Sequence, residues 1–216
     1  MPLMFHPCIV IPCYNHGAMM AAVLHRLKPF NLPCIVVDDG SDETSRVALE
    51  TLATTHDVSF SLIRLAHNVG KGAAVIRGLE EAAAKGFTHA VQVDADGQHA
   101  IEDIPALLAL SKQHPDALIS GRPIYDASVP RSRLYGRWIT HIWVWIETLS
   151  LQLKDSMCGF RVYPLAPTLA LAHRVRLGQR MDFDTEVMVR LYWQGVPVRF
   201  IPLRVIYPLD GLRSEE

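Results

Sequence analysis

Two short apolar runs decide the fold of this chain: CIVIP at residues 8–12 and CIVVD at residues 34–38. Both are rich in β-branched residues and both end in polar or turn residues, as strands buried inside a parallel sheet do. Between them, residues 16–28 carry apolar side chains at helical spacing. The first part of the chain therefore predicts a strand, a helix and a second strand.

The same alternation continues beyond these runs. Further helices are predicted at residues 42–54, 72–85 and 101–113, and further strands at residues 60–65, 90–93 and 117–120. This alternation predicts an α/β fold, with a Rossmann-like, doubly wound, mostly parallel sheet flanked by helices. Because no repeat or flexible linker divides the chain, residues 1–216 are expected to form a single domain.

Composition excludes several classes of protein. The chain has 216 residues, with 21 Lys and Arg against 22 Asp and Glu, so it lacks the basic excess of a nucleic-acid binder. Its four cysteines have neither zinc-site spacing nor the density of a disulfide scaffold, which favours a reducing, cytoplasmic location. No secretion signal is recognised, and no apolar run has the ~18 residues of a spanning helix. Any membrane contact is therefore expected to be peripheral.

Polar and glycine-containing loops follow the predicted strands. In open α/β sheets, ligands bind beyond the carboxyl ends of the strands, so these loops are the expected ligand site. The loops are PCYN at residues 12–15, DDGS at 38–41, NVGKG at 68–72 and DADGQH at 94–99.

Asp94 and Asp96 form the most chemically specific of these patterns. One residue apart at the end of an apolar strand, their carboxylates are expected to converge. Such a pair is unfavourable near a buried edge unless a cation lies between them, and Gln98 adds a neutral oxygen. The pattern indicates Mg²⁺ or Mn²⁺ rather than zinc. A solvated acidic turn is the alternative interpretation.

The loops before two of the helices also fit nucleotide binding. Gly70 and Gly72 flank Lys71 at a helix start, where backbone N–H groups and the lysine favour a phosphate. An ordinary glycine turn would have the same sequence. Asp38 and Asp39 have the chemistry to accept hydrogen bonds from a base or a ribose, or else they cap the following helix.

Six motifs in a fixed order resemble those of family 2 glycosyltransferases of the GT-A fold, particularly the dolichyl- and polyprenyl-phosphate mannosyl- and glucosyltransferases. The resemblance covers nearly the whole chain. The motifs are VIPCYN at residues 10–15, VVDDGS at 36–41, NVGKGAA at 68–74, DADGQH at 94–99, GR at 121–122 and CGFR at 158–161.

This resemblance implies a metal-dependent, inverting enzyme that transfers a hexose from a GDP- or UDP-sugar. It implies a donor half at about residues 1–100 and an acceptor half at about 101–216. It also implies a nucleoside pocket lined by Pro12, Tyr14 and Asp39 and supported by Asp38, and an ion held by Asp94, Asp96 and Gln98. We group Asn15 and Lys71 with the donor-binding residues and treat Asp96 as catalytic.

The expected acceptor is a lipid-linked molecule, and a polyprenyl or dolichyl phosphate fits best. A phosphate oxygen is an adequate nucleophile, so the protein needs cationic groups that position it rather than a base. The candidates are Arg122, in the Gly-Arg motif and also counted as catalytic, and Arg131, Arg133 and Arg137. A solvated basic loop is the competing interpretation.

Alternatives to this function remain open. A hydroxyl-bearing lipid or glycan acceptor would need a general base, and Glu186 is the leading candidate, unless it is merely an acid in the first turn of a helix. A sugar-nucleotide-binding module without turnover is a second alternative, and a nucleotidyltransferase is a third. Asp155 is expected either to hold the following loop over the acceptor or to end a helix.

A tryptophan-rich helix is predicted before this loop. Its apolar stripe consists of Trp138, Ile142, Trp145, Ile146 and Leu149. Core packing is the ordinary interpretation of such a stripe. Contact with a membrane interface is the alternative, because tryptophans suit that boundary and arginines precede the stripe.

Overall fold

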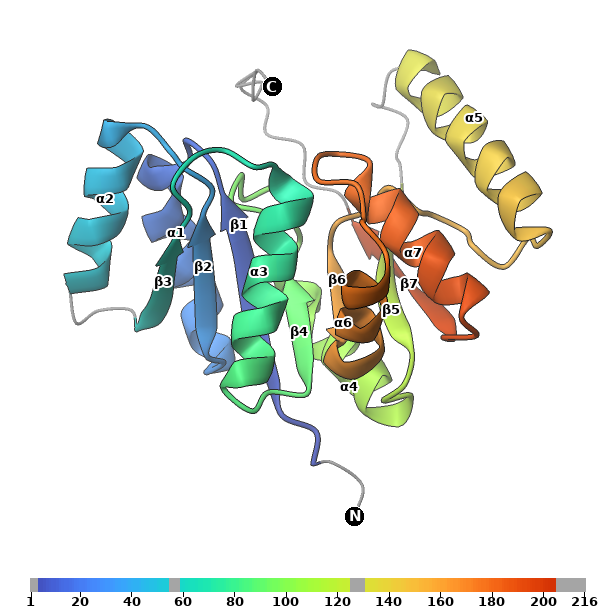
Figure 1. The fold of residues 1–216 in the computed structure, drawn as a ribbon, viewed down its shortest axis with the longest axis horizontal. Helices are drawn as coiled ribbons and strands as arrows, with labels where there is room; N and C mark the ends of the chain where they lie inside the picture. The colour runs from blue at the N-terminus through green and yellow to red at the C-terminus, as the bar shows by residue number, and fades with distance from the viewer. Residues whose placement is uncertain (1–3, 55–58, 125–130, 205–216) are drawn as a thin grey trace.

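The computed structural model describes residues 4–54, 59–124 and 131–204, and a seven-stranded sheet runs through it in the order β3-β2-β1-β4-β6-β5-β7 (Figure 1). Its strands are β1 (Pro7–Cys13), β2 (Cys34–Asp38), β3 (Phe60–Arg64), β4 (His89–Gln92), β5 (Leu118–Ile124), β6 (Arg161–Pro164) and β7 (Val198–Arg204). Neighbouring strands are parallel except at β6, which is antiparallel to both β4 and β5. The predicted mostly parallel α/β fold is confirmed.

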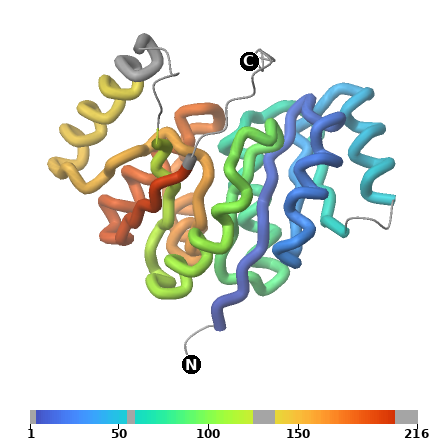
Figure 2. Tube along the Cα trace, turned by 180° about the vertical axis from the view of Figure 1, so that it is seen from behind, coloured from blue at the N-terminus to red at the C-terminus, as the bar shows by residue number. Residues whose placement is uncertain are grey.

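Helices cover both faces of the sheet (Figures 1 and 2). The apolar core on one face includes α3, α6 and α7, and the core on the other face includes α1, α2 and α4. The helices are α1 (Gly17–Leu27), α2 (Glu43–Thr54), α3 (Lys71–Ala84), α4 (Ile104–Gln113), α5 (Arg131–Thr148), α6 (Leu165–Arg174) and α7 (Phe183–Trp193), with short 3-10 turns at Lys28–Phe30 and Ile101–Asp103.

Strand β1 shows how the sequence builds two cores. Cys8 and Val10 point to the α3 face, whereas Ile9 and Ile11 point to the α1 face, and all four are fully buried. Successive side chains of a strand face opposite ways, so a continuous apolar run suits a strand that is covered on both sides. Gly78 lets α3 approach closely, because a Cβ at this position would lie 2.4 Å from Val10 Cγ1.

The elements predicted before residue 121 are present with boundaries shifted by a few residues. The strands β6 and β7 and the helix α6 were not predicted. The sheet continues through the second half of the chain by way of β6, which pairs β4 with β5. The division into donor and acceptor halves of a single domain stays a prediction.

Helix α5 departs from the predicted core packing. It stands at the end of the molecule opposite α2 and contacts α7 (Figure 1). Trp138, Ile142, Ile146 and Leu149 are exposed, so the core interpretation is wrong for these residues, whereas Trp145 is half-buried. Within the described ranges, no helix is long and apolar enough to cross a membrane.

Candidate active site

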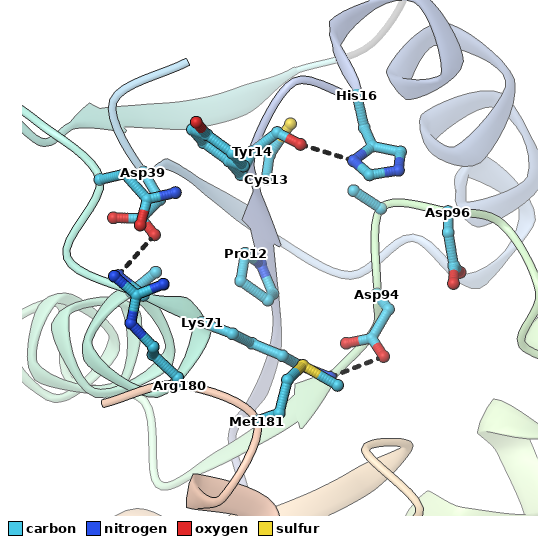
Figure 3. Close-up of a pocket in the computed structure, with 14 residues that line it drawn as sticks. Pro12, Cys13, Tyr14, His16, Asp39, Lys71, Asp94, Asp96, Arg180 and Met181 are labelled. Atoms are coloured by element: carbon cyan, nitrogen blue, oxygen red, sulfur yellow. Dashed lines mark hydrogen bonds and ion pairs between the residues drawn. The ribbon is translucent and has the colours of Figure 1, made fainter. Parts of the chain in front are cut away.

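A cavity of about 690 Å³ lies where β1, β2 and β4 end (Figure 3). This is the carboxyl edge of the parallel strands, where the sequence predicts the ligand site. Polar and charged groups make up much of the lining. The lining residues are Pro12, Cys13, Tyr14, His16, Asp39, Asn68, Gly70, Lys71, Ala74, Asp94, Ala95, Asp96, Arg180 and Met181.

Asp39 organises the loop that enters α3. Its Oδ1 accepts a hydrogen bond of 2.8 Å from Val69 N, and its Oδ2 accepts one of 2.9 Å from Gly70 N. Asp38 lies behind it, with a buried side chain that accepts hydrogen bonds from Arg64 Nε at 2.9 Å and from Ser41 N at 3.0 Å. Asp39 therefore lines the cavity, while Asp38 supports its loop.

Asn15 shapes the turn after β1 rather than the cavity wall. It adopts a left-handed conformation, with φ of 55°, which asparagine tolerates better than most residues. Its backbone N donates to Ser41 Oγ at 2.9 Å, and its Oδ1 accepts from Asp42 N at 2.8 Å. Asn15 thus ties the β1 loop, which carries Pro12 and Tyr14, to the loop after β2.

Lys71 sits between two carboxylates at the floor of the site. Its Nζ lies 2.8 Å from Asp94 Oδ2 and 3.3 Å from Asp184 Oδ2, and its side chain is only 16% exposed. Burial alone would lower the pKa of Lys71, but the two carboxylates outweigh it and hold that pKa above its usual value. The lysine is therefore cationic throughout the physiological range.

The positive charge of Lys71 in turn keeps Asp94 ionised. Burial alone would raise its pKa, but Lys71 and then His99, whose Nε2 lies 3.4 Å from Asp94 Oδ2, hold the pKa well below the usual range. Gly159 packs against this pair, since a Cβ there would lie 3.0 Å from Lys71 Nζ and 3.1 Å from Asp94 Oδ2. The glycine of the CGFR motif therefore allows the second half of the chain to approach the ion pair.

Arg161 balances the negative charge of Asp184, the second carboxylate beside Lys71. It is fully buried, lies 3.9 Å from Asp184 Oδ1, and donates to the backbone oxygens of Asp184 and Ser156. Gln92 joins the network through its Nε2, 3.4 Å from Asp94 Oδ1 and 3.5 Å from Asp184 Oδ1. Buried charges persist when they are paired and hydrogen-bonded in this way.

The carboxylate oxygens of Asp94 and Asp96 suit a hard divalent ion, but they make up only part of a complete set of ligands. Both residues line the cavity, and Asp96 Oδ1 accepts a hydrogen bond of 3.0 Å from Gln98 N. Among the described residues, no cluster of three His, Cys, Asp or Glu side chains could hold a metal ion. Mg²⁺ commonly binds one or two carboxylates together with substrate phosphates, and this arrangement matches that mode. Gln98 is not among the residues described as lining the cavity.

A loop from the second half of the chain closes one side of the cavity. Gln179 O accepts hydrogen bonds from Gly72 N at 2.8 Å and from Ala73 N at 3.4 Å. Gly70 has φ of 104°, and a Cβ there would lie 2.3 Å from Gln179 O, so this contact requires glycine. The docked loop brings Arg180 and Met181 to the cavity (Figure 3).

Three further predicted residues, Glu186, Arg122 and Arg137, do not line the cavity. Glu186 Oε2 accepts from Gly178 N and its Oε1 accepts from Arg190 Nε at 2.6 Å, so this carboxylate supports the docked loop. Arg122 is exposed on β5, and Arg137 pairs with Asp155. The side chains of Arg131 and Arg133 are not among those described.

Sequence reasoning missed two groups of the site. Arg180 carries no local motif, and its position depends on the contact of its loop with Gly72. Asp184, which pairs with Lys71 and Arg161, lies two residues before Glu186 in the same segment, and the role of Glu186 stays a prediction. A helical register would have separated them, because residues two apart on a helix point to different faces.

The chain has the GT-A fold. It superposes on the glucosyl-3-phosphoglycerate synthase of Mycobacterium tuberculosis with a TM-score of 0.71 and 15% identity, covering 96% of this chain and 74% of that one. That crystal structure holds Mn²⁺, uridine-diphosphate-glucose and phosphoglyceric acid. At this identity the likeness shows the fold alone.

The chain belongs to glycosyl transferase family 2, whose family model matches residues 8–175, and it is therefore an enzyme of the glycosyltransferase type. It is 29% identical to the dolichol-phosphate mannosyltransferase of Pyrococcus furiosus over 70% of this chain, which is 44% of the relative's length. It is 24% identical to the UDP-N-acetylglucosamine--dolichyl-phosphate N-acetylglucosaminyltransferase of Methanococcus voltae, over 92% of this chain and 85% of the relative. The predicted resemblance to the polyprenyl-phosphate branch is confirmed.

Proposed function

We propose that this enzyme transfers a hexose from a nucleoside diphosphate sugar to a polyprenyl or dolichyl phosphate, with inversion at the sugar carbon and with Mg²⁺ or Mn²⁺. The observation that carries the proposal is the cavity at the carboxyl edge, where Asp39, Lys71, Asp94 and Asp96 lie together. The names of the relatives from Pyrococcus furiosus and Methanococcus voltae support the class of acceptor.

The residues that line the cavity have separate roles in this proposal. Pro12, Tyr14 and Asp39 bind the nucleoside, and Lys71, held between two acids, faces the diphosphate as a fixed cation. Asp94 and Asp96 would hold the divalent ion, which would neutralise charge on the departing diphosphate. Preorganised charges of this kind favour the transition state without reorganising during the reaction.

A phosphate acceptor fits this site better than a hydroxyl acceptor. Both oxygens of Glu186 are engaged by Gly178 and Arg190, which supports an acceptor that needs no general base from this residue. A lipid phosphate needs no base, since its oxygen is already anionic. Arg122, with Arg131, Arg133 and Arg137 nearby in sequence, remains our proposal for positioning the acceptor, and the cytoplasm our proposal for its location.

A transfer assay tests the proposal. Purified enzyme is incubated with Mn²⁺, a polyprenyl phosphate and either a GDP-hexose or a UDP-hexose labelled in the sugar. We expect label in the lipid fraction with one donor, and loss of that label when EDTA removes the metal. Donor binding by calorimetry without transfer to any polyprenyl phosphate would contradict the proposal and favour a binding module.

A further inference from the structure

The loop after β4 carries Asp94 and Asp96, and both of these acids line the cavity (Figure 3). Asp96 Oδ1 accepts a hydrogen bond of 3.0 Å from Gln98 N. Gly97, between these two residues, has φ of 69°, a left-handed conformation that favours glycine. The direction of the Asp96 carboxylate therefore depends on where the backbone of Gln98 lies.

Arg26, in the last turn of α1, contacts this loop at two points. Helix α1 lies close to the loop, since a Cβ at Gly97 would lie 3.7 Å from Val23 Cγ2. The Nη1 of Arg26 donates to Gly97 O at 3.0 Å, and its Nη2 donates to His99 O at 3.3 Å. These two carbonyl groups stand on either side of Gln98. The guanidinium therefore fixes the backbone both before and after that residue.

A third contact orients the guanidinium. Arg26 Nη2 lies 3.1 Å from Oε1 and 3.3 Å from Oε2 of Glu102, which belongs to the 3-10 turn after the loop. The Glu102 side chain is 67% exposed, and exposed ion pairs add little to stability. The bonds to the two carbonyl oxygens are partly buried, and burial strengthens a hydrogen bond from a charged donor. These two bonds are therefore the stronger part of the contact.

The chemistry of arginine suits this contact. The planar guanidinium presents several N–H donors in a rigid fork, so it can hold two carbonyl oxygens at once, whereas a lysine ammonium is a compact point charge. Arg26 is not among the described residues that line the cavity. Its effect on a ligand would therefore pass through the loop.

We propose that Arg26 is a positioning residue that fixes the orientation of Asp96 toward the cavity, and thereby the affinity of the site for a divalent ion. The inference rests on the proposed function, in which Asp96 holds that ion. Groups that orient the ligands of a metal commonly contribute about 10- to 100-fold to its affinity. The site thus extends beyond its lining to a helix behind the loop.

Calorimetry of GDP and UDP binding, with Mn²⁺ and with EDTA, tests this inference. The quantity compared is the gain in affinity that Mn²⁺ gives, because a general loss of structure would weaken binding under both conditions. The variants are Arg26→Gln, Arg26→Lys, Glu102→Gln and the control Arg77→Gln. Arg77 lies on α3, where its side chain is 40% exposed and pairs with Glu81 at 3.2 Å, one helical turn away.

We expect Arg26→Gln to reduce the Mn²⁺-dependent gain about tenfold, with metal-free binding and circular dichroism unchanged. Arg26→Lys keeps the charge and most of the side chain but not the fork, so it should lose most of the gain as well. Glu102→Gln should reduce the gain by less than about twofold, because both backbone contacts remain. Arg77→Gln should bind as the unchanged enzyme does.

The outcomes separate this inference from the proposed function. An equal Mn²⁺-dependent gain in Arg26→Gln and in the unchanged enzyme would overturn the inference and leave the proposed function intact. A full gain in Arg26→Lys would also overturn it, because the positive charge alone would then suffice. No gain in the unchanged enzyme would overturn the metal assignment of the proposed function, and this inference with it.

Discussion

The two walls of the cavity come from different halves of the chain and are built differently. The first wall is formed by the loops after β1, β2, β3 and β4 and by the start of α3, and its side chains are fixed by neighbours in adjacent loops, as Asp39 is by Val69 and Gly70. The second wall, with Arg180 and Met181, is held by contacts with the first, through Gln179 and the network of Asp184. One wall is encoded by local motifs and the other by tertiary packing.

This difference predicts unequal effects of mutation on binding and on folding. Substitutions in the first wall should reduce ligand binding with the fold intact, whereas buried charges behind the second wall should affect folding first. Four substitutions, ordered from the largest expected effect to the smallest, test whether the walls are separable.

Asp96→Asn should have the largest effect on ligand binding. It removes a carboxylate proposed to hold the divalent ion while keeping the side-chain volume, so Mn²⁺-dependent binding of GDP or UDP should fall about 100-fold, with no change in circular dichroism. Calorimetry with and without Mn²⁺ measures this. Asp116→Asn, an exposed residue before β5, is the control and should bind as the unchanged enzyme does. Unaltered metal-dependent affinity in Asp96→Asn would refute the metal assignment.

Asp184→Asn should be the most destabilising of the four. It leaves the buried Arg161 guanidinium and the Lys71 ammonium with one fewer counter-charge, and removing one partner of a buried pair costs about 3–5 kcal/mol of unfolding free energy. Urea denaturation followed by fluorescence measures that free energy. A stability loss below about 1 kcal/mol would show that the network is not needed for the fold of the second half.

Arg180→Ala should separate binding from folding within the second wall. The side chain lines the cavity but is exposed, so its loss should weaken donor diphosphate binding about tenfold and change stability by less than about 0.5 kcal/mol. Calorimetry and urea denaturation of the same preparation give both values. Arg174→Ala, an exposed arginine at the end of α6, is the matched control. Equal donor affinities in these two variants would remove Arg180 from the binding site.

Glu186→Gln should have the smallest effect on turnover. The amide can still accept from Gly178 N but loses the charge that faces Arg190, so we expect a stability loss of about 1 kcal/mol or less and nearly unchanged turnover. Initial rates at saturating donor and acceptor measure this. Abolished turnover in a folded Glu186→Gln protein would instead favour a hydroxyl acceptor and a general base at this position.

Much of the first wall could be predicted from the sequence because most of its motifs lie close to the ends of strands. A strand end determines where the next residues lie, so strand prediction assigns Asp39, Asp94 and Asp96 to one edge of the sheet, whereas Lys71 is assigned by the predicted start of a helix. The role of Gln98 stays a prediction. The elements of the first half were predicted for the same reason, since their periodicity matches their burial.

The second half resisted prediction for physical reasons. Strand β6 has four residues and begins with an arginine, and a buried arginine in a strand is intelligible only once Asp184 and Ser156 O are known to surround it. Helix α5 was recognised from its periodicity, but periodicity identifies an apolar face and not what covers it. The first failure concerns partners that lie far away along the chain, and the second concerns a helix face that the described residues leave exposed.

The hydrogen bond from Gly72 N to Gln179 O also has a consequence for how the molecule is made. Contacts between residues so distant in sequence form late, because a long loop must close before they are gained. During synthesis the first wall can emerge and fold with its sheet while the second wall is still missing. The enzyme should therefore acquire its affinity for donor only at the last stage of folding, when α7 docks and the loop before it reaches α3.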